Sequence, residues 1–195
     1  MIRKQDILDR AAKWGLRPGV VEKDYALGWL LAAVARHPET AQRWVFKGGT
    51  CLKKCFIETY RFSEDLDFSL LSSATYSAEG LLTILREIAR DATEISGIEL
   101  AEPETSVRER QDKLGRPTFQ GKVGYRGPLA VPGWPRVLLD LTRHEPVVAE
   151  PVRRPIIHPY PDALPDGAEV STYSLEEILA EKTRALWERT RPRDA

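Results

Sequence analysis

Two aspartates, Asp65 and Asp67, stand two residues apart in a segment where apolar and polar residues alternate. In an extended strand, side chains two residues apart project from the same face, so both carboxylates can reach one ligand. Mg²⁺ prefers one or two such carboxylates together with the phosphate oxygens of a substrate. The pair therefore predicts a divalent-cation site that handles phosphate groups.

A third aspartate, Asp140, lies in a separate apolar run at residues 137–142. If that run is a neighbouring strand, its carboxylate can complete a two-metal site or accept the proton of an attacking hydroxyl. This arrangement suits phosphoryl transfer. We predict that Asp65, Asp67 and Asp140 are metal ligands and catalytic residues.

Gly48, Gly49 and Thr50 precede the aspartate pair, with fourteen residues between Thr50 and Asp65. Glycines let backbone N–H groups approach a ligand, and a helix beginning after Thr50 would direct its positive N-terminal end at a phosphate. The segment is not a P-loop, because no Gly-Lys-Ser/Thr follows it. We predict that these three residues bind the phosphate groups of the substrate.

Each of these signals has an ordinary structural explanation when taken alone. An Asp-x-Asp triplet is common as two solvated carboxylates on an edge strand, and an isolated Asp140 could cap a turn. The order glycine turn, helix and carboxylate strand favours the site. Two further features are interpreted structurally: Cys51 and Cys55 as reduced packing residues, and residues 22–24 as a charged helix face.

Hydrophobic periodicity predicts the elements that hold these residues. Helices are expected at residues 3–14, 20–36, 51–57 and 77–95, and from Ser174, where Ser174 and Glu177 form a capping box. Strands are expected at residues 44–47, 61–71, 118–126 and 136–143, the last two as an antiparallel pair. Prolines between residues 145 and 166 exclude regular interior structure there.

The predicted fold class is α+β, with a short mixed sheet flanked by helices. We expect one domain over residues 1–195: a helical region at 1–40, a catalytic core at 41–145, and a proline-rich segment with a terminal helix at 146–195. The longest apolar stretch, residues 25–35, is about half of what spans a bilayer. A cytoplasmic location without a membrane partner is therefore expected. The net charge of zero does not by itself indicate any partner.

The motifs resemble the AbiEii/AbiGii toxin family of nucleotidyltransferases, which has the fold of the polymerase-beta-like superfamily. The resemblance is carried in order by residues 21–31, 46–53, 61–69 (RFSEDLDFS), 137–142 and 175–189. It implies a nucleotidyltransferase fold, a Mg²⁺ or Mn²⁺ cofactor and a nucleoside triphosphate (NTP) substrate.

Carried over residue by residue, the resemblance makes Asp65 and Asp67 the metal pair and Asp140 the third strand carboxylate. It places Gly49, Thr50 and Ser63 on the phosphate side. Lys182 is similar to the family lysine that contacts nucleotide phosphates, although by its own sequence context it would be an exposed helix lysine.

Further cations have two interpretations. Lys47 and Arg61 flank the site and could lend charge to a triphosphate. The basic tail could contact nucleic-acid phosphates or simply solvate a helix end; its members are Arg184, Arg189, Arg191 and Arg193.

The resemblance implies transfer of a nucleotidyl group to RNA, at a tRNA 3′ end, by the toxin of a toxin–antitoxin system with roles in abortive infection and phage defence. A cognate antitoxin is then an expected partner. Relatives continue into a further helical region that is expected to be missing here, which leaves acceptor binding and the role of Asp194 open. Two alternatives stand: an antibiotic-modifying nucleotidyltransferase, and an inactive nucleotide-binding or antitoxin-binding remnant.

Overall fold

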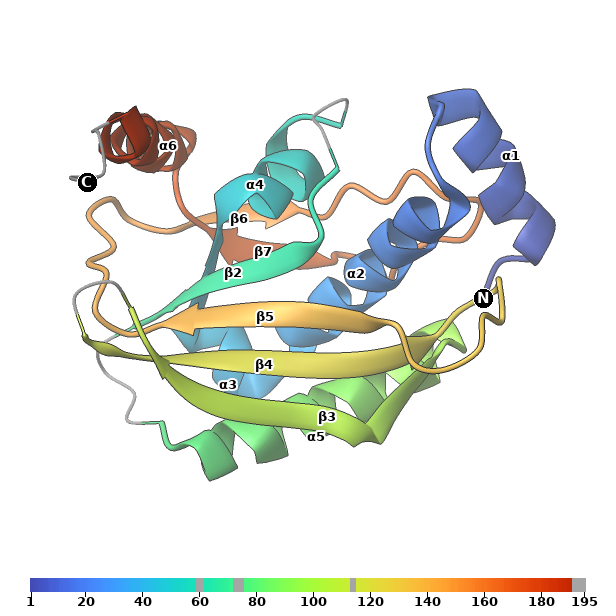
Figure 1. Cartoon of the computed structure of the whole chain (residues 1–195), viewed down its shortest axis with the longest axis horizontal. Coiled ribbons are helices and arrows are strands. Elements are labelled where there is room, and N and C mark those ends of the chain that lie inside the picture. Colours follow the sequence, from blue (N-terminus) through green and yellow to red (C-terminus); the bar gives the residue numbers. More distant parts are fainter. Residues whose placement is uncertain (59–61, 72–75, 113–114, 191–195) are drawn as a thin grey trace.

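The strand that carries Asp65 and Asp67 lies inside one mixed sheet with the strand order β3-β4-β5-β2-β1-β7-β6 (Figure 1). The computed structural model describes residues 1–58, 62–71, 76–112 and 115–190, apart from the side chains of residues 188–190. The strands are β1 (Trp44–Lys47), β2 (Asp65–Leu70), β3 (Glu99–Gln111), β4 (Pro117–Arg126), β5 (Arg136–Thr142), β6 (Val152–Pro155) and β7 (Glu169–Thr172).

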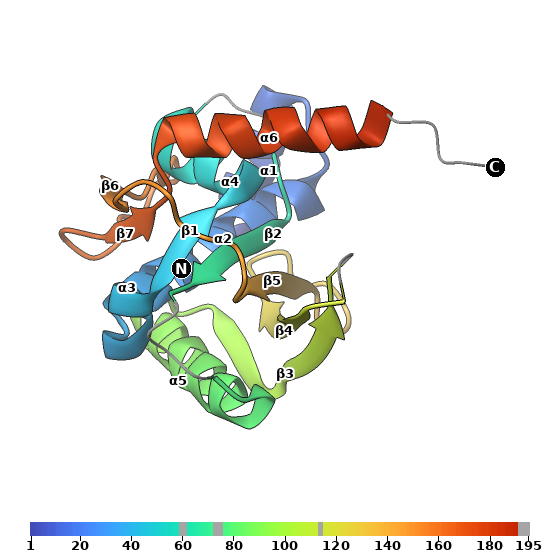
Figure 2. The same ribbon diagram turned by 90° about the vertical axis from the view of Figure 1, so that its left-hand side faces the viewer.

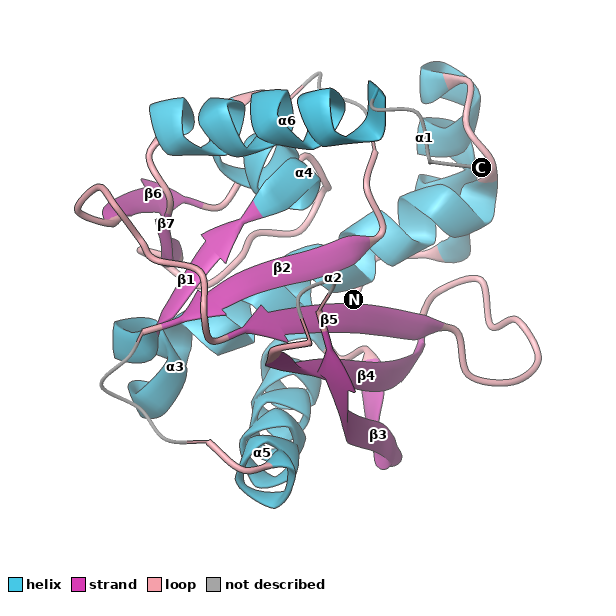
Figure 3. Ribbon diagram, turned by 60° about the vertical axis from the view of Figure 1, so that its left-hand side comes forward, coloured by secondary structure: helices cyan, strands magenta, loops and turns pink. Residues whose placement is uncertain are grey.

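Helices cover the sheet unevenly. They are α1 (Lys4–Trp14), α2 (Pro18–Arg36), α3 (Pro38–Arg43), α4 (Gly48–Cys51), the π-helical turn η1 (Leu52–Phe56), α5 (Ala78–Ser96) and α6 (Leu175–Thr190). Figure 3 shows α2 behind β2 and β5 and α5 below the strands, whereas Figure 2 shows α6 lying across α4. The predicted α+β class with helices flanking a mixed sheet is confirmed.

Strand pairing brings the predicted carboxylate strands together. β2 is antiparallel to β1 and parallel to β5, and β5 is antiparallel to β4, as predicted. The apolar side of β2, Leu66 and Phe68, is fully buried, while Asp65 and Asp67 are half-buried on the other side. The alternation predicted for this strand is therefore confirmed, although the strand begins at Asp65.

Several element predictions need correction. α2 begins at Pro18, which is tolerated in a first helical turn, and α4 begins at Gly48 rather than after Thr50. The elements α3, β3 and β7 were not expected. The proline-rich segment is mainly loop, and its strand β6 lies at the edge of the sheet beside β7, which agrees with the absence of regular interior structure predicted there.

The predicted capping box is only half present. The Glu177 N–H donates to Ser174 Oγ at 3.2 Å. The Glu177 carboxylate instead accepts from the backbone N–H groups of Val148 and Ala149, at 2.8 and 3.4 Å. It thereby fastens α6 to the loop that follows β5.

The interpretation of residues 22–24 as a charged helix face is wrong for Glu22 and Asp24, which are 1% and 2% exposed. Glu22 Oε1 accepts from the Leu129 N–H at 2.6 Å, and Asp24 Oδ2 accepts from Lys54 Nζ at 2.7 Å. Buried carboxylates need such partners because unpaired charge is costly away from water. These two residues therefore join α2 to the β4–β5 loop and to η1.

Two smaller expectations concern the cysteines and the membrane. Cys51 and Cys55 are free and buried, as predicted. Within the described part of the chain, no helix has both the length and the apolar character needed to cross a membrane.

Candidate active site

The three predicted carboxylates share one face of the sheet. Asp67 and Asp140 are direct Cα partners in the parallel strands β2 and β5. Asp65 pairs with Leu138, two residues earlier along each strand. Neighbouring strands lie about 4.8 Å apart, so the first two carboxylates are adjacent. The structure thus brings Asp140 to the aspartate pair.

One row of polar residues crosses the sheet at this point. Lys47 is the partner of Asp67 in β1, and Gln120 is the partner of Asp140 in β4. Gln120 Nε2 donates to Asp140 Oδ1 at 3.0 Å, which fixes one oxygen of that carboxylate. The contribution of Gln120 was not expected, since only the register between β4 and β5 reveals it.

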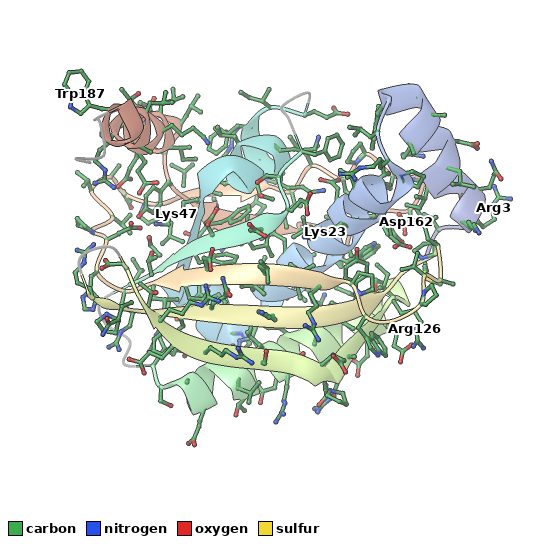
Figure 4. All side chains as sticks on the ribbon, viewed as in Figure 1. Arg3, Lys23, Lys47, Arg126, Asp162 and Trp187 are labelled. Atoms are coloured by element: carbon green, nitrogen blue, oxygen red, sulfur yellow. The ribbon has the colours of Figure 1, made fainter. Side chains whose placement is uncertain are left out.

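Lys47 is held by two acidic side chains. Its Nζ forms an ion pair with Glu145 and lies 3.9 Å from Glu181 Oε1 of α6. Figure 4 shows Lys47 below α6. Burial lowers the pKa of Lys47, while the carboxylates of Glu181 and Asp67 act in the opposite direction. Lys47 therefore joins α6 to the carboxylate row.

The surroundings of Asp65 and Asp67 disfavour the ionised form of both carboxyl groups. Burial, followed by the negative charge of Asp140, raises the pKa of Asp67 to about 7. Burial also raises the pKa of Asp65, although Lys23 partly opposes this. A bound divalent cation would reverse both effects, because it favours the charged forms.

Gly48 approaches the site so closely that a side chain would not fit. Its φ is +80°, a left-handed conformation that favours glycine. A Cβ placed on Gly48 would overlap the Asp67 carboxylate and lie 2.9 Å from its Cγ. The backbone of the glycine turn therefore borders the predicted metal site directly.

The phosphate-side residues meet at the second glycine. A Cβ on Gly49 would lie 3.4 Å from Ser63 Oγ and 3.7 Å from Lys182 Nζ. The Lys182 amino group of α6 thus lies beside a turn more than a hundred residues earlier in the sequence. This proximity is independent of the family resemblance and favours a site role over that of a plain surface lysine.

Thr50 is placed differently from the other turn residues. It is 1% exposed, and its hydroxyl donates to the Asp65 carbonyl at 2.5 Å. The side chain therefore ties α4 to the start of β2. A phosphate contact by Thr50 stays a prediction, as do the metal contacts of the aspartates.

The remaining expectations concern a metal cluster and residues outside the described ranges. Among the residues described, no three His, Cys, Asp or Glu side chains are arranged as ligands of one ion. Arg61, Arg191, Arg193 and Asp194, and the side chain of Arg189, lie outside the described residues.

Comparisons with known proteins identify the class to which this fold and site belong. The family model "Nucleotidyl transferase AbiEii toxin, Type IV TA system" matches residues 29–195. The chain therefore belongs to the AbiEii family of nucleotidyl transferase toxins, and the family predicted from its motifs is confirmed. The comparison with curated proteins gives no match.

A solved structure shares the fold. MenT4, a nucleotidyltransferase toxin from Mycobacterium tuberculosis H37Rv, superimposes with a TM-score of 0.57 and 22% sequence identity. The match covers 95% of this chain and 59% of the MenT4 chain. The present chain thus spans less than two thirds of the length of that structure.

The contact between Gly48 and Asp67 can be tested with a matched glycine. Gly133 has nearly the same φ, +82°, but nothing lies within 4 Å of a Cβ built there. Gly48→Ala and Gly133→Ala should each lower the free energy of unfolding by about 1–2 kcal/mol, because an alanine is strained in the left-handed conformation. Only Gly48→Ala should also lose the rise in melting temperature that Mg²⁺ and a mixture of the four NTPs produce. An equal rise in both variants would contradict the assignment.

The raised pKa of Asp67 predicts a pH dependence of stability in EDTA. The folded protein keeps a proton on Asp67 that the unfolded chain loses near pH 3.8. Relative to Asp67→Asn, the wild-type free energy of unfolding should therefore fall as pH rises from about 4 to about 7, and then level off. The total fall should be on the order of 1–4 kcal/mol. Urea unfolding at several pH values measures it, and parallel curves would refute the raised pKa.

Proposed function

We propose that this chain transfers a nucleotidyl group from an NTP to an acceptor hydroxyl, using Asp65, Asp67 and Asp140 to hold a divalent cation, Mg²⁺ or Mn²⁺. The observation that carries the proposal is the pairing of Asp67 with Asp140 across β2 and β5, directly against the Gly48 turn. Carboxylates, a glycine turn and the lysine-bearing helix α6 together suit an NTP better than any apolar ligand.

The residues divide the chemistry between them. The acceptor hydroxyl attacks the α-phosphorus, the bond from that phosphorus to the bridging oxygen breaks, and diphosphate leaves. A bound cation supplies charge neutralisation for the phosphates. We assign to Asp140 the role of accepting the proton of the attacking hydroxyl, because Gln120 bonds to only one of the two Asp140 carboxylate oxygens. Lys182, beside Gly49 and Ser63, stabilises the negative charge that develops on the leaving phosphates.

For the acceptor we propose RNA, and specifically the 3′ end of tRNA, with arrest of growth as the outcome. Support comes from the family description as a type IV toxin and from the fold shared with MenT4, itself described as a nucleotidyltransferase toxin. A cognate antitoxin would then counteract the activity. An antibiotic acceptor and a binding-only remnant are the competing functions.

Label transfer separates these functions. The chain is incubated with Mg²⁺, total RNA, a mixture of hydroxyl-bearing antibiotics and each α-³²P-labelled NTP in turn, and the products are separated by size. Label on RNA is the expected result. Label that appears only on a small-molecule acceptor supports the antibiotic-modifying alternative, and NTP binding without transfer supports the remnant.

Substitutions then test the assigned roles. Asp65→Ala or Asp67→Ala should abolish transfer and leave the fold intact, because these half-buried carboxylates contribute little to the core. Lys182→Ala should lower the single-turnover rate by roughly a hundredfold at saturating NTP, a usual loss for one electrostatic contact. The control is Lys13→Ala, an exposed helix lysine of α1. Equal rates for both lysine variants would remove Lys182 from the site.

A further inference from the structure

One face of β3 and β4 is left open beside the carboxylates. α5 covers the opposite face so closely that a Cβ on Gly121 would lie 2.6 Å from Leu85 Cδ1. Gln120 and Lys122, which flank Gly121 in β4, therefore point to the other side. In Figure 1 this side faces the viewer, and none of the described helices lies in front of these strands. A ligand can approach the carboxylates across it.

Strand register places basic residues on this open face. Arg108 of β3 pairs with Gln120, which pairs with Asp140. One pleat away, Lys122 pairs with Leu138, which pairs with Asp65. Two strand spacings separate each basic residue from its aspartate, or about 10 Å.

Arg110 extends the basic surface along β3. It stands two residues beyond Arg108, on the same face, and pairs with Thr118. Arg108 and Arg110 are exposed, and Lys122 is half-buried. We call these three residues, Arg108, Arg110 and Lys122, the open-face cations.

The open-face cations differ from many other cationic residues that the structure describes, because no carboxylate pairs with them. Within the described ranges, none of the three lies within ion-pair distance of a carboxylate, whereas salt bridges occupy Arg3, Arg36, Arg43, Arg90, Arg116, Arg126, Arg136 and Arg153. The overall net charge is zero, so this local excess does not follow from composition. Unpaired cations held on rigid strands suit a polyanion.

We propose that the phosphate backbone of an acceptor RNA lies across the open face of β3 and β4, bound by Arg108, Arg110 and Lys122. This rests on the proposed nucleotidyl transfer. The spacing of about 10 Å lets phosphates on the open-face cations belong to the same strand as a hydroxyl at Asp140, because successive phosphates are only a few ångströms apart. The RNA approaches from the β3 edge, while the NTP occupies the Gly48 turn and Lys182.

The test is direct RNA binding by the double variant Arg108→Glu/Arg110→Glu. Its matched control is Lys13→Glu/Arg86→Glu, which reverses the same number of exposed charges on α1 and α5. Fluorescein-labelled unfractionated tRNA is titrated at several salt concentrations. The double variant should bind at least tenfold more weakly, and the slope of log Kd against log salt should fall by about 1.5–2. The control should bind like the wild type.

Two further measurements keep folding and the transfer reaction separate from this surface. Arg108→Lys/Arg110→Lys should retain tRNA binding, since it keeps both charges. Binding of Mg²⁺–NTP should be unchanged in all the variants. Equal tRNA affinity of the Glu variant and the control, or absence of tRNA binding by the wild type, would overturn the proposal even if label transfer succeeds. Binding that depends on both arginines, without any label transfer, would instead overturn the proposed function alone.

Discussion

The repulsion between Asp67 and Asp140 is the constraint on which the rest of the site depends. Parallel pairing of β2 and β5 makes these two carboxylates neighbours, and burial denies them full solvation. Two carboxyl groups in such a position are stable only if one of them is protonated or a cation lies between them. Lys47 lies on one side of the pair and Gln120 on the other, yet the pKa of Asp67 still rises to about 7. A cation bound with a triphosphate would relieve this repulsion.

Polar contacts hold the glycine turn and the strands in the arrangement that brings Asp67 and Asp140 together. Lys54 of η1 donates to Asp24 of α2, and Tyr160 donates to the same Asp24 oxygen at 2.8 Å. Thr50 ties the turn to β2, and Glu177 fastens α6, which carries Lys182, to the loop after β5. Lys54–Asp24 is a buried ion pair. Removing one partner of such a pair typically costs about 3–5 kcal/mol, so this pair holds η1 firmly against α2.

The part of the site that could be predicted is the part encoded by local spacing. The period of two in β2 placed Asp65 and Asp67 on one face, and the Gly-Gly pair predicted a tight turn between β1 and a helix, although not its contact with Asp67. The contact of Gln120 with Asp140 depends on the register between β4 and β5, and the contacts of Lys47 depend on how α6 and the loop after β5 pack. No local pattern encodes either. β3 was missed because Pro103 and its many charged residues obscure any alternation. The burial of Glu22 and Asp24 had a signal that was not used, namely apolar residues on every side of α2.

The most direct test of a cation held by Asp67 and Asp140 is calorimetric titration of the chain with unreactive α,β-methylene analogues of the four NTPs, each with Mg²⁺ and then with EDTA. Carboxylates and phosphates repel one another unless a cation lies between them, so the best-bound analogue should bind at least tenfold more tightly with Mg²⁺. Asp67→Asn should lose most of that difference. Equal affinity in Mg²⁺ and EDTA would contradict the account and favour a simple cationic phosphate site.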